Sequence, residues 1–392
     1  MAKKTKVKEF LQSDNIAAEF DEVELDKIGK QLVEWFDEDN DSRKDWLNKS
    51  EEYLKLATQV VEKKSFPWAD AANVKYPLLT VASMQFNARA YPALVPGPNL
   101  VSGLVIGVDQ DGQKRQSSDR IGKHMSYQLL FEMEDWEEDM DKLTFTLPIV
   151  GCMFKKTYYD PLKKINHSHL IQPKDFVIDY YAKSIDNADR KFHVIYKNDN
   201  QVLERVRRGL FLDVELGQPV SLSEDKKPVT GKPTEPKISP ATPYKFIEAH
   251  CWWDLDGDDY REPYVITIAY ESKKVVRIVP RFDEKGITFN DKEEIVRIEP
   301  IEYFTKFGFI PNPDGSIYDL GFGLLLGGLN ETVNTLTNQL LDSGTLNNLQ
   351  AGFLGRGIRI KGGNTRFQPG EWKPVDFTRS EEHTSELQSR SA

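Results

Sequence analysis

The sequence predicts an α+β protein with a helical N-terminal part, a β-rich centre and a long helix near its C-terminal end. Three observations lead to this prediction. Apolar residues recur at helical intervals over residues 21–150, β-branched and aromatic residues dominate residues 151–312, and helical spacing returns over residues 313–349. A chain of 392 residues, of which 39% are hydrophobic, is long enough to bury a sizeable core.

Composition and charge restrict the class of protein. No apolar run approaches the roughly 18 residues of a membrane-spanning helix, and the N-terminus lacks the apolar stretch of a signal peptide, so we expect a soluble protein without a membrane partner. The net charge of −10 argues against a protein that grips DNA through many contacts between cations and phosphates. It does not argue against one that lets DNA slide. Cys152 and Cys251 lie far apart and are expected to be small core residues.

The N-terminal part is predicted to be mostly helical. Residues 1–20 are expected to form a flexible arm, and two charged helices follow, with Asp37 to Asp41 as the turn between them. A third helix should run from about Tyr76 to Tyr91, where Pro92 stops it. We expect a short strand over residues 100–109, a helix over residues 119–142, and strand structure over residues 143–161.

The centre is predicted to consist of strands and turns, with one helix in the sequence QVLERVRR between Arg190 and Arg208. Residues 218–243 contain six prolines and alternating charges, and we expect a disordered insertion there.

The sequence contains no convincing catalytic, cofactor or metal site. It lacks the phosphate-binding motif GxxxxGK[ST], and HExxH and GxSxG are also absent. His124 and the pair His167 and His169 have no acidic or cysteine neighbours in sequence, so we expect structural histidines. The acidic cluster from Glu134 to Asp141 is interpreted as a solvated face. We therefore expect no enzyme activity and no cofactor.

One loop resembles a cation-binding loop only superficially. Asp254, Asp256 and Asp258 surround Gly257, but an EF-hand needs its glycine at the sixth position and a glutamate at the twelfth, and neither is present. A polar hairpin turn explains these residues, and the sequence leaves open whether they bind a cation.

Two stripes mark the predicted C-terminal helix. An apolar stripe contains Leu329, Val333, Leu336 and Leu340, and a polar stripe contains Asn330, Asn334, Asn338 and Asp342. Amides form helix less readily than Ala, Leu or Glu, so a helix that meets only a core gains nothing from the polar stripe. A buried core helix with a solvated back is the simpler interpretation of the spacing alone.

The amino-acid sequence of this stretch favours another interpretation. The sequence YDLGFGLLLGGLNETVNTLTNQLLDSGTLNN, residues 318–348, resembles the helix that leads into the stem of portal proteins of short-tailed, double-stranded DNA bacteriophages. Residues 66–97 and 143–161 also resemble portal sequence. The resemblance implies a non-enzymatic subunit of a ring of about twelve copies at one capsid vertex, through which DNA is packaged and later ejected. Such a ring joins head to tail in the virion after assembly in the bacterial host cytoplasm.

The same resemblance assigns the parts of the chain. It places residues 21–150 and 151–312 in the wing, residues 313–349 in the stem and residues 350–378 at the start of the clip. The expected partners are other copies of the chain, the packaging terminase, tail or head-completion proteins, capsid and scaffolding proteins, and DNA that passes without sequence specificity. Both stripes of the stem helix would contact neighbouring subunits or the DNA channel, and a basic group would contact a clip partner: Arg356, Arg359, Lys361 and Arg366.

Two other classes of protein stay open. A phage-encoded metal-dependent nuclease or head-maturation protease could use the acidic cluster or the Asp254 loop, and a monomeric adaptor is a further alternative.

Residues 379–392 contain RSEEHTSELQS, which resembles a translated sequencing adapter, so we exclude them from fold reasoning. We expect the true protein to be longer, and residues 1–378 to expose the apolar stripe and aggregate instead of forming a ring.

Overall fold

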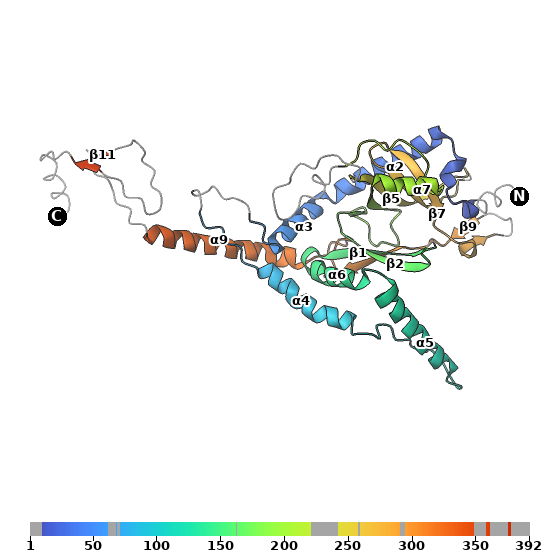
Figure 1. Ribbon diagram of the computed structural model, residues 1–392, viewed down its shortest axis with the longest axis horizontal. Helices are drawn as coiled ribbons and strands as arrows, with labels where there is room; N and C mark the ends of the chain where they lie inside the picture. Colours follow the sequence, from blue (N-terminus) through green and yellow to red (C-terminus); the bar gives the residue numbers. More distant parts are fainter. Residues whose placement is uncertain are drawn as a thin grey trace. The chain divides into compact units, whose positions relative to one another are not determined.

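A computed structural model of the chain has the predicted mixed α+β fold, with N-terminal helices, central antiparallel sheets and a long C-terminal helix (Figure 1). The structure describes residues 10–61, 68, 71–161, 163–220, 242–257, 259–290 and 295–348, together with the backbone of 358–360 and 375–377. The chain divides into two compact units. The first combines Met1–Val60 with Pro77–Gly328, and the second combines Val61–Tyr76 with Leu329–Ala392.

The first unit begins with packed residues where the sequence analysis expected a flexible arm up to residue 20. Phe10 and Ile16 are buried, and the short helix η1 (Ile16–Glu19) follows Asn15. The Asn15 side chain accepts hydrogen bonds from the backbone of Ala17 at 3.1 Å and Ile278 at 3.0 Å. An asparagine that satisfies a helix start and a strand edge together anchors this segment. Residues 1–9 lie outside the described part.

Two helices follow, and the predicted turn between them is wrong. Helix α2 (Glu22–Ser42) continues through Asp37 to Asp41, and the chain breaks at Arg43 before α3 (Lys44–Ala57). The reason is a distant partner: Asp39 in α2 accepts hydrogen bonds from the Arg190 guanidinium at 2.6 and 2.9 Å. This bidentate pair fixes Asp39 on the side of α2 that faces Arg190, so the acidic residues continue the helix instead of forming a turn.

The next helices differ from prediction in their bounds. Helix α4 (Leu78–Leu94) includes Pro92, which was expected to stop it. The predicted helix over residues 119–142 is divided into α5 (Gln113–Tyr127), the π-helical η2 (Gln128–Glu132) and α6 (Trp136–Val150). Residues 100–109 are not a strand, and residues 143–150 are helical, contrary to the prediction. Leu143, Thr144 and Leu147 are buried on α6, so tertiary packing overrides the strand-like composition of residues 143–150.

Antiparallel sheets form the centre of the first unit, as the strand composition predicted. The largest has the order β3-β4-β5-β6-β7, a second has β10-β1-β2, and β8 pairs with β9. Strand β6 lies between β5 and β7 and is buried along its whole length. The strands are β1 (Cys152–Asp160), β2 (Ile165–Ile171), β3 (Phe176–Val177), β4 (Arg190–Lys197), β5 (Tyr244–Trp253), β6 (Glu262–Ala269), β7 (Lys274–Pro280), β8 (Ile287–Phe289), β9 (Ile295–Ile298) and β10 (Phe304–Gly308).

Helix α2 covers the five-stranded sheet and builds the main core. Phe36 of α2 meets Phe192 of β4 edge to face, with ring centroids 5.6 Å apart. Such pairs add to the gain from burying apolar area, which is the main stabilising contribution. The predicted helix QVLERVRR is α7 (Asp199–Arg207), and η3 (Glu284–Gly286) precedes β8. Cys152 and Cys251 are buried, as predicted.

The second unit contains most of helix α9 (Phe322–Asn348), which confirms the predicted C-terminal helix. Its unexpected member is the segment 61–76, which precedes α4 in the sequence but belongs with α9. A short antiparallel pair, β11 (Ile358–Ile360) with β12 (Val375–Phe377), follows the helix. The predicted insertion over residues 218–243 falls mostly outside the described residues, as does the tail over 379–392.

Candidate functional site

The polar stripe of α9 binds an extended segment of the same chain through a ladder of hydrogen bonds. The backbone N–H groups of Ala72, Val74 and Tyr76 donate to side-chain oxygens of α9, at 2.7, 2.7 and 2.6 Å. Their acceptors, in the same order, are Asp342, Asn338 and Asn334. The Asn338 amide also donates to the carbonyl of Val74 at 3.1 Å, so the asparagine satisfies both backbone groups of one residue.

The ladder follows from the repeat lengths of the two elements. Four residues of an α-helix advance by about 6.0 Å, and two residues of an extended chain advance by about 6.6 Å. Side chains at every fourth helical position therefore meet alternate residues of an antiparallel extended segment. An amide can both accept and donate, which a segment with exposed N–H and C=O groups requires. This geometry explains why asparagines stand where better helix formers would be expected.

The burial of α9 is the reverse of that in a core helix. Asn330, Asn334 and Asn338 are 1%, 6% and 7% exposed, whereas the leucines of the helix are largely exposed. The exposed fraction is 55% for Leu329 and 75% for Leu340. The exposed leucines of α9 are Leu324, Leu325, Leu329, Leu336, Leu340, Leu341 and Leu346. At helical spacing, Leu325, Leu329, Leu336 and Leu340 share one side of α9, and exposed apolar side chains grouped in this way usually mark a protein interface.

The predicted contact residues of α9 thus separate into two groups. Leu329, Leu336 and Leu340 are exposed and Val333 is partly exposed in the single chain, and their contact with neighbouring subunits stays a prediction. Asn334 and Asn338 bind residues 74–76, a partner that sequence reasoning missed, and Asn330 is also buried. Because the partner lies at least 258 residues away, no local signal could have identified it.

The predicted clip residues cannot be placed as a group. Arg356, Lys361 and Arg366 lie outside the described residues, and only the backbone of Arg359 is described, in β11.

Three carboxylates gather at the turn between β5 and β6. Asp254, Asp256 and Glu262 each offer an oxygen, and these oxygens lie within 4.8 Å of one another. Asp254 also shapes the turn by accepting the backbone N–H groups of Gly257 at 2.8 Å and Asp259 at 3.0 Å. The predicted polar turn is therefore present, and Gly257 has a positive φ of 72°, which glycine adopts readily. Asp258 lies outside the described residues.

Sequence reasoning missed Glu262, which stands at the start of β6 and is fully buried. Oxygen ligands from several carboxylates are what divalent cations such as Mg²⁺ or Ca²⁺ bind, so the group has the ligand chemistry of a cation site. A glutamate at the first residue of an otherwise apolar buried strand was the available sequence signal.

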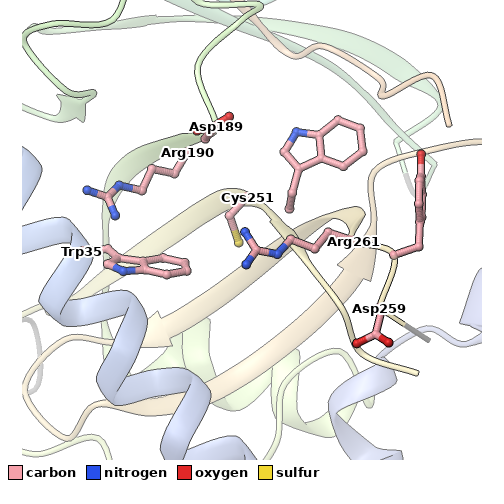
Figure 2. Close-up of a pocket in the computed structure, with 8 residues that line it drawn as sticks. Trp35, Asp189, Arg190, Cys251, Asp259 and Arg261 are labelled. Carbon is pink, nitrogen blue, oxygen red and sulfur yellow. The ribbon is translucent and has the colours of Figure 1, made fainter. Parts of the chain in front are cut away.

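A pocket of about 640 Å³ lies beside this turn (Figure 2). It has aromatic walls and charges of both signs, and Figure 2 shows Trp35 and Arg261 on opposite sides of Cys251 in that view. Arg190 stacks over Trp35, 5.3 Å from the ring centre, and its guanidinium is bound to Asp39. Burial raises the pKa of Cys251 to about 12, so its thiol stays protonated at neutral pH. The lining residues are Trp35, Asp189, Arg190, Cys251, Trp252, Asp259, Tyr260 and Arg261.

A cluster of charged and polar side chains joins the two larger sheets. Lys156 of β1 forms an ion pair with Glu248 of β5, which also contacts His193 Nδ1 at 3.0 Å. Burial alone would raise the pKa of Glu248, but the charges of Lys156 and His193 hold it well below its usual value. Burial, aided by the charge of Lys156, lowers the pKa of the neighbouring His250 well below its usual value. These are structural charges within the fold.

The histidine pair on β2 also has a structural setting. The rings of His167 and His169 stack with centroids 5.3 Å apart, and the Asp160 carboxylate lies 3.9 Å from His167 Nε2. The acidic neighbour that the sequence did not place beside them therefore comes from the paired strand β1.

Comparisons with known proteins add no assignment. No protein-family model matches the sequence, and a search of curated proteins finds no significant match. Among the helices in the described part of the chain, none is long and apolar enough to cross a lipid bilayer.

Proposed function

We propose that this chain is a structural subunit of a bacteriophage portal ring, which forms the DNA channel at the capsid vertex and serves genome packaging, ejection and head–tail joining. The observation that carries the proposal is the reversed burial of α9. Most of its leucines are exposed in the single chain, while Asn334 and Asn338 are buried and bind residues 74–76.

A helix with exposed leucines is expected to gain much of its stability by packing against neighbouring subunits. Burying a leucine side chain contributes about 1.5 to 3 kcal/mol, so several leucines per chain provide a large driving force for association. Repetition of one helix around a closed ring buries the same face in every copy. The 27 residues of α9 span about 40 Å at 1.5 Å per residue, which suits a strut across a layer of protein.

The resemblance of residues 318–348 to portal stem helices supplies the identity of the ring. On that basis the partners are the packaging terminase, tail or head-completion proteins, capsid and scaffolding proteins, and DNA in transit. The net charge of −10 suits a channel that does not hold DNA through many cationic contacts.

The test is the assembly state of the protein expressed from its genomic reading frame. We expect native mass spectrometry and negative-stain images to show rings of about twelve copies. The same preparation should show neither ATPase nor nuclease activity. A stable monomer at micromolar concentration would contradict the proposal.

A second candidate is a metal-dependent nuclease, favoured by the cluster of Asp254, Asp256 and Glu262. Carboxylates that hold Mg²⁺ could orient and activate water for phosphodiester cleavage. The decisive comparison is DNA cleavage with Mg²⁺ by the natural protein and by Glu262→Gln. Cleavage that the substitution abolishes, with folding intact, would replace the portal proposal by this one.

A further inference from the structure

A segment that joins α4 to α5, together with α5 itself, projects from the first unit, and we call it the basic arm. The basic arm comprises residues 100–112, which belong to no helix or strand, and helix α5, which extends away from the sheets of this unit (Figure 1). Ser126 Oγ accepts the backbone N–H of Val101 at 3.0 Å, and the Asp109 carboxylate accepts the N–H of Arg115 at 3.0 Å. A Cβ on Gly122 would lie 2.7 Å from the Val101 carbonyl oxygen. The segment 100–112 is therefore fitted closely against one side of α5.

The other side of the segment 100–112 is apolar and exposed. Leu104, Ile106 and Val108 are 88%, 87% and 75% exposed. Leu104 and Ile106 occupy alternate positions, which places them on one side of an extended chain. Val108 follows a bend at Gly107, whose φ is 95°. Ile121 and Met125 of α5 are also exposed. An apolar group of this kind usually marks a docking surface.

The helix adds a strong positive charge to this surface. Within Gln113–Tyr127 the only carboxylate is Asp119, and four exposed cations accompany it: Lys114, Arg115, Arg120 and Lys123. The partner of the arm should therefore combine apolar and acidic side chains.

The same chain carries a surface with that composition. The acidic face consists of exposed residues of α4, of α6 and of the turn before α6: Val81, Met84, Glu134, Glu137, Glu138 and Asp141. Hydrogen bonds of 2.9 Å join the two helices, from Tyr91 to Glu137 and from Asn87 to Asp141. Apolar and acidic side chains are thereby held on one rigid pair of helices.

We propose that the basic arm of one copy docks on the acidic face of the next copy. The positive charge of the arm lies on α5, which has four cations and one carboxylate, whereas the segment 100–112 adds Asp109 and Asp111. The face has four carboxylates, of which Glu138 also pairs with Lys142 at 2.7 Å. The charges of α5 and of the face are therefore complementary. Because the two patches differ, each copy can donate an arm and receive one, and such a head-to-tail contact can close into a ring. The proposal rests on the ring assembly proposed above and identifies a contact that builds it.

Two charge-reversed variants of the protein expressed from its genomic reading frame test the contact. The arm variant carries Arg120→Glu with Lys123→Glu, and the face variant carries Glu134→Lys with Glu138→Lys. Each variant alone then brings like charges together, and we expect its self-association to weaken by about tenfold or more. A mixture of the two variants restores opposite charges at both contacts, so its association should return to the natural level.

The measurement is sedimentation velocity at low and high salt, with circular dichroism to verify folding. Lys27→Glu with Lys30→Glu on α2 is the matched control, because it changes two exposed lysines by the same charge. The control should associate as the natural chain does. Added salt should weaken the natural contact, since it screens the charges.

A cross-linking experiment locates the contact independently of its strength. Both natural cysteines are buried, so a chain with Leu104→Cys and Met84→Cys offers two new accessible thiols. We expect oxidation to join copies only when both substitutions are present in the mixture, either on one chain or on two. Cross-linking by Leu104→Cys alone would indicate a symmetric contact and overturn the proposal.

Three further outcomes also overturn the proposed contact: a natural chain that stays monomeric, an arm variant that associates normally, and a mixture that does not recover. An arm variant that assembles normally but loses binding to the capsid protein would assign the arm to that protein instead. The ring is judged separately by negative stain. Normal rings from the arm variant refute the contact alone, whereas arm-to-face cross-links without rings refute the portal function alone.

Discussion

At the scale of single residues, Asn338 is the central member of the ladder on α9. Replacement by Ala removes both of its hydrogen bonds to Val74, and a polar group left without a partner costs about 1 to 3 kcal/mol. We expect Asn338→Ala to increase hydrogen exchange of the amides of residues 72–76. Asn347→Ala, at an exposed position of the same helix, is the control and should change nothing. Unchanged protection in both variants would show that the ladder contributes no stability.

The buried histidine of β5 predicts how stability depends on pH. The pKa of His250 is lowered from 6.5 in the folded state, so below about pH 6.5 the unfolded chain binds more protons than the folded chain. Folding stability should therefore decrease as pH falls below that value. The depressed pKa of Glu248 acts in the same direction at lower pH, below 4.5. Urea unfolding from pH 7.5 to 5 should show the loss for the natural chain and a smaller loss for His250→Phe. Equal slopes would contradict this assignment.

At the scale of one element, the leucine face of α9 predicts a variant that alters association without altering folding. Leu336 and Leu340 are exposed, so Leu336→Ser with Leu340→Ser should leave the thermal unfolding of the single chain nearly unchanged. Light scattering after size exclusion should show less self-association, because each leucine loses roughly 1.5 to 3 kcal/mol of burial. The control is Thr335→Ala on the same helix. Association equal to that of the natural chain would place the subunit contact elsewhere.

The elements also show which features a sequence can predict. The periods of α9 and α7 and the β-branched composition of the centre give the correct fold class, because local spacing and propensity agree there with the tertiary structure. Residues 143–150 were predicted to be a strand and are helical, because packing decided against local composition. The turn predicted at residues 37–41 failed because Arg190, far away in sequence, binds Asp39. The segment 72–76 was missed for the same reason, since its partners on α9 are also far away in sequence.

At the scale of the whole molecule, the net charge of −10 predicts weak interaction with DNA. Each phosphate that a protein neutralises releases counterions and steepens the dependence of affinity on salt. We expect binding of duplex DNA to this chain to be weak and to have a shallow salt dependence. Titration by fluorescence anisotropy at several salt concentrations measures both quantities. Tight binding with a steep negative slope would indicate a DNA-gripping protein and exclude the sliding channel.

The helix α9 and the extended segment bound to it have slightly different repeat lengths, so their hydrogen-bonding groups stay in register over only a short length. Each step of four helical residues falls short of two extended residues by about 0.6 Å. Over the two intervals between Asn334 and Asp342 the mismatch reaches about 1.2 Å, which small bends of the segment can absorb. Further steps would exceed the tolerance of a hydrogen bond. The number of rungs is therefore limited by geometry, so additional asparagines along the helix would not lengthen the clamped segment.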